Sequence, residues 1–290
     1  MKYTYYPGCS LRGTGRAYEE SLLAVFRALD IELEELEDWN CCGATTYLSV
    51  DELTSYALAA RNLALAEREH RDVIAPCAAC YLVLNKTQRY MHDYPDIKLV
   101  VTRALAAIGL TCEDHVRVRH PLDILLHEVG LKTIAEKVKI PLKGLKVAPY
   151  YGCQIVRPYA TFDDQHNPTS MDRLLEACGA KIVYYPLKTR CCGGSQKGTL
   201  PEIGLDLIHY LLSEAQKNGA EVIATVCPLC QFNLECFQKE AGNHPPISMP
   251  VLYFTQLMAL ALGASAKTIG LQRSLVSIAP VLAKKEIAYA

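Results

Sequence analysis

Ten of the thirteen cysteines in this 290-residue chain fall into two sets with the same order: a single cysteine, an adjacent pair, then a C-x-x-C step. The sets are Cys9, Cys41, Cys42, Cys77 and Cys80, and then Cys153, Cys191, Cys192, Cys227 and Cys230. Thiolates are soft ligands that suit zinc, copper(I) and iron–sulfur clusters, and a C-x-x-C step places two sulfurs on one turn. Each set is therefore expected to bind a metal centre.

The adjacent pair in each set favours a cluster over a single zinc ion. Neighbouring cysteine sulfurs do not converge comfortably on one tetrahedral ion, but they can contact different irons of a multinuclear cluster. Five thiolates also exceed the four that a structural zinc site or an ordinary cubane requires. An enlarged or open cluster is the simplest account of the fifth.

Other roles for the cysteines compete with cluster binding. Any of them could be a buried small apolar side chain, which is the role expected for Cys112, Cys178 and Cys236 outside the pattern. A structural zinc protein and a thioredoxin-like oxidoreductase are two further alternatives. Thioredoxin chemistry needs only one C-x-x-C step and gives no reason for the adjacent pairs.

The cysteine sets are part of a longer repeat. Residues 2–9 and 146–153 are both short β-prone runs that end in Gly-Cys. The interval between the two copies is 144 residues at the first cysteine and 150 at the later landmarks. An insertion of about six residues explains the change, and the polar segment 163–168 is its expected place because its composition is that of a loop.

The repeat predicts three parts of the chain. Residues 1–140 would form the first half with one site, residues 141–263 the second half with the other site, and residues 264–290 a tail without cysteine. Pro141 and Gly144 mark the expected join. The sequence leaves open whether the tail docks on the body or on a partner.

Alternating strand and helix patterns in both halves predict an α/β fold. The β-prone runs are 3–6, 32–36 and 72–76, and then 146–151, 181–185 and 221–226. Apolar stripes at helical spacing, expected to face the core, are Leu53, Ala57, Ala60 and Leu63, and then Ile203, Leu207, Leu211 and Ala215. Strands separated by helices favour a small parallel sheet, flanked by helices, in each pseudo-symmetric half. The carboxyl ends of parallel strands gather ligands, and Cys9, Cys77, Cys153 and Cys227 would all lie there.

Composition and charge exclude several classes of protein. The net charge is −1 and there is no long run of like charge, so neither nucleic acid nor an anionic membrane surface is expected as the main partner. No apolar stretch approaches the ~20 residues of a membrane-spanning helix, and the N-terminus lacks the apolar core of a signal peptide. A cytoplasmic protein that is not integral to a membrane is expected. In that reducing compartment, cysteines in fixed spacings more often bind metal or do redox chemistry than form disulfides.

The two motif copies, each with glycine after the adjacent pair, resemble the cysteine-rich CCG-domain family, which includes the B subunits of heterodisulfide reductases. The resemblance runs from Lys2 to about Gly263 and covers both motifs in full. It implies that each cysteine set holds a noncubane [4Fe-4S] cluster and that the two clusters face one cavity, where they form the catalytic centre. A disulfide would be split between them, or thiols oxidised, with electrons exchanged through a ferredoxin-like iron–sulfur subunit. A flavoprotein subunit is also implied.

Residues beside the cysteines are candidates for supporting roles. Glycines that allow tight turns and let backbone N–H groups approach cluster sulfurs are Gly8, Gly43, Gly152, Gly193 and Gly194. Cations that could bind an anionic disulfide are Arg12, Arg16, Arg157, Lys188, Arg190 and Lys197. Ordinary turns and solvated surface charges are the alternative roles of these two groups.

A non-catalytic role is the second functional hypothesis. The sequence has no nucleotide, flavin or nicotinamide motif, so electrons must come from another chain. The chain would then be an iron–sulfur electron relay or a metal-stapled scaffold, and the chemistry would take place on a partner.

Overall fold

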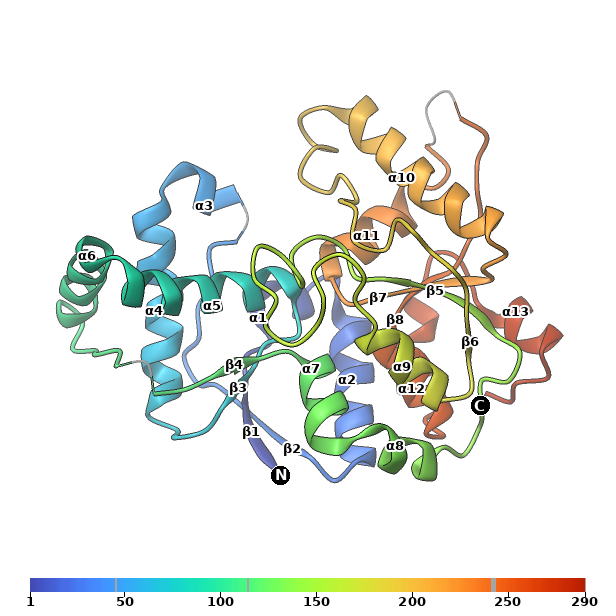
Figure 1. Ribbon diagram of the computed structural model, residues 1–290, viewed down its shortest axis with the longest axis horizontal. Coiled ribbons are helices and arrows are strands. Elements are labelled where there is room, and N and C mark those ends of the chain that lie inside the picture. Colours follow the sequence, from blue (N-terminus) through green and yellow to red (C-terminus); the bar gives the residue numbers. More distant parts are fainter. Residues whose placement is uncertain (45, 114, 241–243, 290) are drawn as a thin grey trace.

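Two four-stranded parallel sheets carry the fold in the computed structural model, which describes residues 1–44, 46–113, 115–240 and 244–289 (Figure 1). The first sheet has the order β2-β1-β3-β4 and the second the order β6-β5-β7-β8. The strands of the first are β1 (Lys2–Tyr5), β2 (Glu32–Glu35), β3 (Val73–Ile74) and β4 (Val118–Arg119). Those of the second are β5 (Lys146–Tyr150), β6 (Lys181–Ile182), β7 (Val222–Thr225) and β8 (Val251–Tyr253). The prediction of an α/β fold with a parallel sheet in each half is confirmed.

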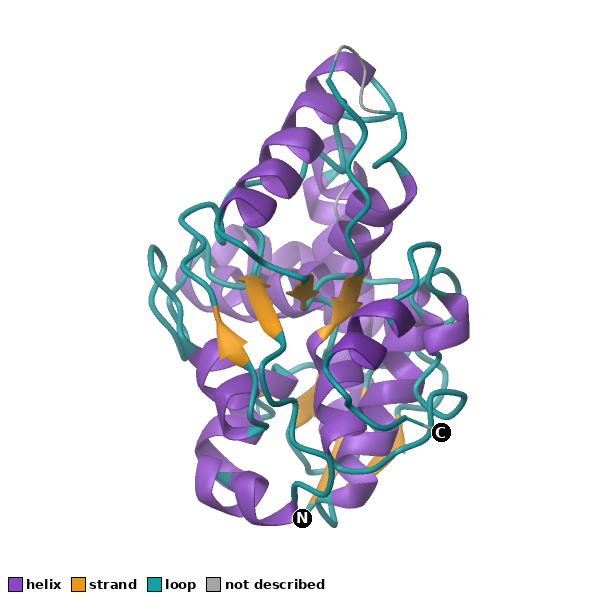
Figure 2. Ribbon diagram, turned by 90° about the vertical axis from the view of Figure 1, so that its right-hand side faces the viewer, coloured by secondary structure: helices purple, strands orange, loops and turns teal. Residues whose placement is uncertain are grey.

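Helices surround both sheets (Figure 2). Those around the first are α1 (Gly8–Leu11), α2 (Arg16–Ala28), α3 (Thr46–Val50), α4 (Glu52–Glu67), α5 (Ala78–Asp93), α6 (Pro95–Ala106), α7 (Pro121–Asp123), the π-helix η1 (Ile124–Val129) and α8 (Leu131–Lys137). Those that follow are α9 (Ser170–Ala177), α10 (Pro201–Lys217), α11 (Pro228–Cys236), α12 (Phe254–Ala261), the 3-10 helix η2 (Leu271–Arg273) and α13 (Ala279–Lys284). In the described part of the chain, no helix has the length and apolar character needed to cross a membrane.

The expected apolar stripes are only partly in the core. Ala60 and Leu63 of α4 are fully buried, as are Leu211 and Ala215 of α10. The prediction is wrong at the first turns of these helices, where Leu53 is 43% exposed and Ile203 is 49% exposed. The two residues are 150 positions apart and thus correspond in the repeat. In both helices the first turn buries a small residue instead, Ser55 in α4 and Gly204 in α10.

The halves are joined by α2 and α12, which pack side by side (Figure 1). The Tyr18 and Tyr253 rings stack, with their centroids 4.5 Å apart. The hydroxyl groups of Ser21 and Thr255 are 2.6 Å apart. One continuous cluster of buried apolar side chains includes residues of both sheets. The division at residue 140 therefore stays a prediction.

The C-terminal tail docks on both halves of the body. Arg273 donates two hydrogen bonds to the Glu20 carboxylate on α2, at 2.9 and 2.7 Å. The Glu235 carboxylate on α11 accepts hydrogen bonds from the backbone N–H groups of Leu275 and Val276. The tail thus bridges α2 and α11, while its last residue, Ala290, lies outside the described part.

Candidate metal centres

All ten repeated cysteines follow the carboxyl ends of strands, at matching places in the two halves. Cys9 lies on α1 just beyond β1, and Cys77 is the N-cap of α5 just beyond β3. In the second half, Cys153 follows β5, and Cys227 is the N-cap of α11 beyond β7. The adjacent pairs lie in loops after β2 and β6. Parallel β–loop–α connections thus bring five thiols to one edge of each sheet.

The sulfur atoms meet in contacting pairs, and the pattern is the same in both halves. The Sγ atoms of Cys9 and Cys41 are 3.7 Å apart, and those of Cys42 and Cys80 are 3.4 Å apart. In the second half the corresponding thiol pairs are in hydrogen-bond contact, Cys153 with Cys191 and Cys192 with Cys230. All thirteen cysteines are free thiols.

The contacts run from thiol to thiol along each set, because Cys41 also contacts Cys42 and Cys80 also contacts Cys77. Across residues 1–44, 46–113, 115–240 and 244–289, no three or more His, Cys, Asp or Glu side chains are grouped as ligands of a metal ion. An extended row of five thiols that includes both members of an adjacent Cys-Cys step suits ligands spread over several irons, because each iron then takes one or two sulfurs.

Each site has an exposed edge and a buried base. Cys9, Cys41 and Cys191 are exposed and Cys153 is half-buried. The adjacent partners and both C-x-x-C steps are buried: Cys42, Cys77, Cys80, Cys192, Cys227 and Cys230. A group bound by five such thiols would be held by the buried cysteines of its set. It would be accessible to solvent on the side of Cys9 in the first site and of Cys153 in the second.

Hydrogen bonds between thiols prepare one thiolate in each site. Those from Cys42 and Cys9 lower the pKa of Cys41 to about 2, and those from Cys153 and Cys192 lower the pKa of Cys191 to about 2. The pKa of Cys42 rises to about 12, mainly because its thiol donates to Cys41. The thiolate is the form that binds metal. The exposed first member of each adjacent pair thus accepts hydrogen bonds from two neighbouring thiols, which favours its thiolate form.

Two glycines make room for the buried C-x-x-C sulfurs. Gly8 has φ +66°, and a Cβ there would lie 2.9 Å from the Cys80 Sγ. Gly152 has φ +70°, and a Cβ there would lie 3.1 Å from the Cys230 Sγ. Real Cβ atoms essentially never approach so closely as at Gly8, and positive φ favours glycine at both positions.

The other three glycine candidates support the adjacent pairs through their backbone. The Gly193 N–H donates to the Cys191 Sγ at 3.3 Å. In the same way, Gly43 donates to the first cysteine of its pair, and Gly194 donates to the second cysteine of its own. Each of these hydrogen bonds favours the thiolate form of the sulfur that accepts it. All three backbone N–H groups thus contact cysteine sulfurs, and the supporting role of these glycines around a cluster stays a prediction.

Two buried tyrosines that we did not single out from the sequence hold the adjacent-pair loops. The Tyr6 hydroxyl donates to the Asn40 carbonyl at 2.8 Å, and the Tyr150 hydroxyl donates to the Arg190 carbonyl at 2.7 Å. Both carbonyls come directly before the first cysteine of the pair. The sequence does contain a signal for these residues, because each copy of the repeat has a tyrosine three residues before its single cysteine.

Four of the six candidate cations are already paired with carboxylates. Arg12 binds Glu19 and Glu35, Arg16 binds Glu20, Lys197 binds Glu240, and buried Lys188 binds Asp172 at 2.9 Å. Arg157 instead donates to the Thr189 hydroxyl at 3.0 Å. Arg190 is exposed beside Cys191. Among the described residues, no carboxylate forms an ion pair with Arg157 or Arg190, so these two charges are available to an anion.

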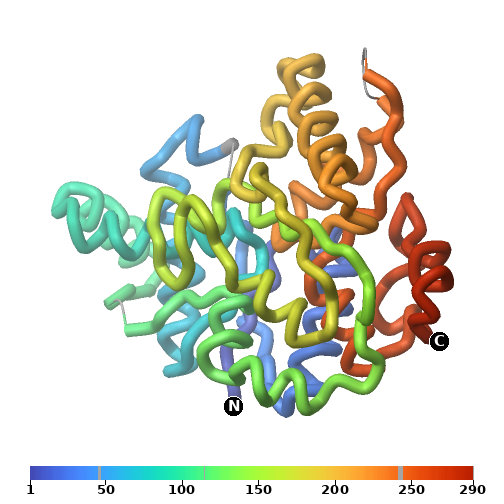
Figure 3. The backbone as a smooth tube through the Cα atoms, turned by 45° about the vertical axis from the view of Figure 1, so that its right-hand side comes forward, coloured from blue at the N-terminus to red at the C-terminus, as the bar shows by residue number. Residues whose placement is uncertain are grey.

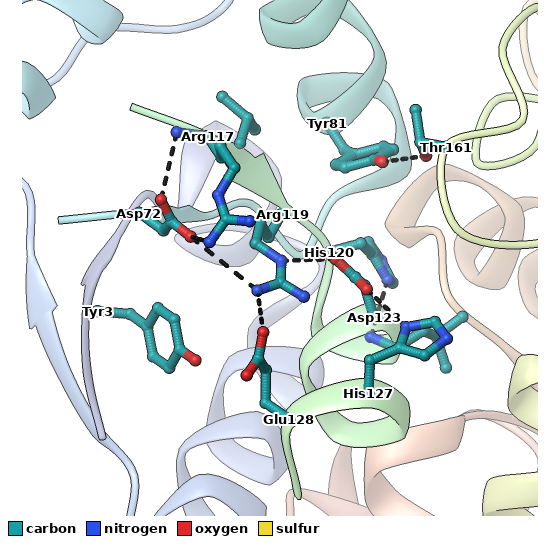
Figure 4. Close-up of polar contacts among 12 residues, drawn as sticks. Tyr3, Asp72, Tyr81, Arg117, Arg119, His120, Asp123, His127, Glu128 and Thr161 are labelled. Carbon is teal, nitrogen blue, oxygen red and sulfur yellow. Dashed lines mark hydrogen bonds and ion pairs between the residues drawn. The ribbon is translucent and has the colours of Figure 1, made fainter. Parts of the chain in front are cut away.

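A loop of the second half, residues 157–169, lies against the first half at Tyr81 and His120 (Figure 3). Thr161 on this loop shares a short hydrogen bond with the Tyr81 hydroxyl, next to Cys80 in the sequence (Figure 4). The Phe162 ring stacks on His120, with 6.2 Å between centroids and 3° between planes. The loop contains the polar segment 163–168, which is loop structure as expected.

His120 connects this loop to the C-x-x-C step of the first site. Burial lowers the pKa of His120 to about 3, so the ring is neutral at physiological pH. Its Nδ1 accepts from the Leu122 N–H at 3.1 Å, and Nε2 donates to the Pro76 carbonyl, just before Cys77, at 2.9 Å. No motif marks this histidine in the sequence.

Arg119 fixes the strand that presents His120 (Figure 4). Its Nε donates to the Asp123 carboxylate at 2.6 Å and its Nη1 to the Glu128 carboxylate at 2.5 Å. Only 10% of the arginine side chain is exposed, so these ion pairs are shielded from water more than surface pairs are. They hold the two-residue strand β4 against α7 and η1.

Comparison with known proteins identifies both halves. The cysteine-rich domain family named CCG matches residues 3–85 and again residues 147–235. A protein of Archaeoglobus profundus that is named as similar to the B subunit of heterodisulfide reductase is 34% identical, with 91% of each chain covered. The B subunit of the ferredoxin:CoB-CoM heterodisulfide reductase of Methanosarcina mazei is 31% identical, over 98% of this chain and 96% of that one.

Two other similarities bear on fold and on role. The 8-methylmenaquinol:fumarate reductase membrane anchor subunit of Wolinella succinogenes is 32% identical, over 95% of this chain and 97% of that one. The crystal structure of a hypothetical protein from Helicobacter pylori superposes with a TM-score of 0.76 at 14% identity, over 95% of this chain. The chain spans about half the length of that protein, 52%. This last similarity shows the fold alone.

Proposed function

The chain belongs to the cysteine-rich CCG-domain family, and we propose that it is the catalytic subunit of a heterodisulfide-reductase-like complex. It would reduce a disulfide, or oxidise thiols in the reverse direction. Relatives named as subunits of heterodisulfide reductases support an oxidoreductase subunit at the coarser level. The ferredoxin-like electron-transfer subunit, the flavoprotein and the cytoplasmic location expected from the sequence remain predictions.

The two cysteine sets fit iron–sulfur clusters in their donor chemistry, and we assign one noncubane [4Fe-4S] cluster to each. The ligands would be Cys9, Cys41, Cys42, Cys77 and Cys80 for the first, and Cys153, Cys191, Cys192, Cys227 and Cys230 for the second. When bound, the clusters supply Lewis-acidic irons and electrons to the sulfurs of a disulfide. The observation that carries the proposal is the duplicated pairing of sulfurs, Cys42 with Cys80 and Cys192 with Cys230, within one core.

The protein's own groups would bind and orient the substrate. Reduction consumes two electrons and two protons for each disulfide and releases two thiols. A negatively charged disulfide would be attracted to Arg157 and Arg190 beside the second site, because those guanidinium groups form no ion pair with a carboxylate of the described residues. At the first site Arg12 is neutralised by Glu19 and Glu35. The charged end of the substrate would therefore lie towards the second half.

A titration with an anionic disulfide tests this function. In the anaerobically purified complex, adding a disulfide that carries carboxylate or sulfonate groups should change the electron paramagnetic resonance (EPR) spectrum of the clusters. The Arg190→Gln variant should need about tenfold more of it, because a charge-assisted hydrogen bond of about 1.4 kcal/mol is lost. Arg103→Gln on α6, which is also exposed, is the control and should behave as wild type.

A second candidate, a non-catalytic electron relay, is favoured by the similarity to the anchor subunit of a menaquinol:fumarate reductase. A relay would pass electrons without binding a disulfide. If the EPR spectrum of the wild-type complex changes with neither disulfide nor thiol, that result would support the relay and contradict the catalytic proposal. If wild type and Arg190→Gln need the same concentration of disulfide to change the spectrum, the catalytic proposal would stand, but Arg190 would have no role in binding the substrate.

A further inference from the structure

Two buried asparagines from different helices hold the main chain at the adjacent cysteine pairs. Asn62 of α4 contacts both main-chain groups of Asn40, the residue directly before Cys41. The Asn40 N–H donates to the Asn62 Oδ1 at 2.9 Å, and the Asn62 Nδ2 donates to the Asn40 carbonyl at 3.0 Å. In the second half, the Nδ2 of Asn233 on α11 donates to the Cys192 carbonyl at 2.5 Å. Each side-chain amide thus binds the backbone at or beside an adjacent pair.

Neither asparagine has a polar counterpart in the other half. The interval between the two copies is 150 residues at the adjacent pairs and the C-x-x-C steps, so Asn62 corresponds to Leu212 and Asn233 corresponds to Val83. Leu212 and Val83 are both buried, and an apolar side chain can neither donate nor accept a hydrogen bond. The two sites therefore have equivalent cysteines but hold the adjacent pairs by different hydrogen bonds.

The contact of Asn62 fixes the first cysteine of its pair. A peptide unit is planar, so a group that fixes the Asn40 carbonyl also fixes the position of the Cys41 nitrogen and Cα. The Tyr6 hydroxyl donates to the same carbonyl at 2.8 Å. With its N–H bound as well, the main chain of Asn40 is held on both sides, and the start of the adjacent pair is tied to α4.

The contact of Asn233 acts on the second cysteine of its pair. The carbonyl that accepts its hydrogen bond belongs to Cys192 itself. Asn233 lies three residues after Cys230, on the helix that the C-x-x-C step opens. The thiols of Cys192 and Cys230 are also in contact. Asn233 thus ties the adjacent pair to the helix whose cysteine this pair contacts.

We propose that Asn62 and Asn233 are positioning residues, each for the adjacent pair of its own site. Asn62 orients Cys41 through Asn40, and Asn233 orients Cys192 through its carbonyl. The inference rests on the proposed function, because it requires clusters at these cysteines. Partners that orient metal ligands typically contribute about 10- to 100-fold to metal binding. Because the two asparagines do not correspond, loss of either one should weaken one site and spare the other.

The test compares Asn62→Leu with Asn233→Val in the iron-loaded full-length chain, purified without oxygen. Each change installs the side chain that the other half has at the corresponding position. The chains are treated with the iron chelator bipyridyl and with N-ethylmaleimide, and mass spectrometry measures how fast each adjacent pair is alkylated. We expect the first adjacent pair to be alkylated about tenfold faster in Asn62→Leu, with the second at the wild-type rate. Asn233→Val should show the reverse.

The EPR spectrum gives a second measurement. In chains that still hold all their iron, it should change in both asparagine variants because the ligands of one cluster have shifted. Gln238→Met is the matched control. The buried Gln238 amide also binds both main-chain groups of one residue, accepting from the Met249 N–H at 2.8 Å and donating to its carbonyl at 2.7 Å. Neither residue belongs to a cysteine set, so this variant should keep the wild-type rates and spectrum.

Wild-type alkylation rates in both asparagine variants would overturn the proposal. Equal acceleration at both pairs in either variant would also overturn it, because the asparagine would then act on the fold as a whole. Iron analysis of the same samples separates the two levels. A wild-type chain without iron would overturn the cluster assignment together with this role, whereas full iron in wild type with unchanged rates in the variants would overturn only the role of the asparagines.

Discussion

The Cys192→Ala variant is expected to lose disulfide turnover by more than about 100-fold, and Cys42→Ala is expected to do the same. Substitutions of residues that merely support metal ligands typically cost about 10- to 100-fold, so loss of a ligand should exceed that range. Each substitution also removes the sulfur that contacts the C-x-x-C step, Cys230 in one site and Cys80 in the other. If both centres hold the substrate, one intact site cannot replace the other.

Turnover of a defined anionic disulfide by the assembled complex, normalised to protein, measures this effect. Cys236→Ala is the control because Cys236 is half-buried and outside both sets. The catalytic account predicts near-complete loss in both ligand variants and wild-type turnover in the control. Full turnover in either ligand variant would contradict a two-centre mechanism, and loss in the control as well would show that the assay reports folding instead.

The Gly8→Ala variant is expected to lose the first cluster and keep the second, so that iron falls from about eight to about four per chain. The added methyl group would lie 2.9 Å from the Cys80 Sγ, and the sulfur or the Gly8 backbone would have to move. Gly152→Ala should have the mirrored effect on the second site, where the distance to the Cys230 Sγ is 3.1 Å.

Gly109→Ala separates the sulfur contact from backbone strain. Gly109 has φ +70°, close to that of Gly8, but nothing lies within 4 Å of its added methyl group. Both substitutions carry the roughly 1–2 kcal/mol penalty of a left-handed alanine. Iron per folded chain should be halved in Gly8→Ala and unchanged in Gly109→Ala. Equal iron in the two variants would mean that the approach to Cys80 does not matter for binding.

The repeat made most of the fold predictable. All six predicted strand runs overlap a strand, and the single cysteines and C-x-x-C steps lie beyond those strands as expected. The fourth strand of each sheet was missed. Strand β4 lies in the short alternating run 116–119, which we did not interpret as a strand because it has no counterpart among the cysteine landmarks of the repeat. Strand β8 runs without a break into the apolar helix α12 and gave no separate signal.

The contacts between halves could not be predicted, because they depend on how two similar units face each other. Tyr18 and Ser21 appear in the sequence as ordinary residues of an amphipathic helix, and only the packing of α2 on α12 reveals their partners. The contact of Phe162 with His120 depends on the path of a loop that has no counterpart in the first half. Candidate cations were chosen by distance along the chain, which does not show that Lys188 is buried against Asp172.

The measurement that tests the central claim most directly is the content of iron, acid-labile sulfide and zinc in the chain purified without oxygen. Two four-iron clusters predict about eight iron and about eight sulfide per chain, with zinc near zero. About two zinc with no sulfide would contradict the account and leave a metal-stapled scaffold whose chemistry occurs on a partner.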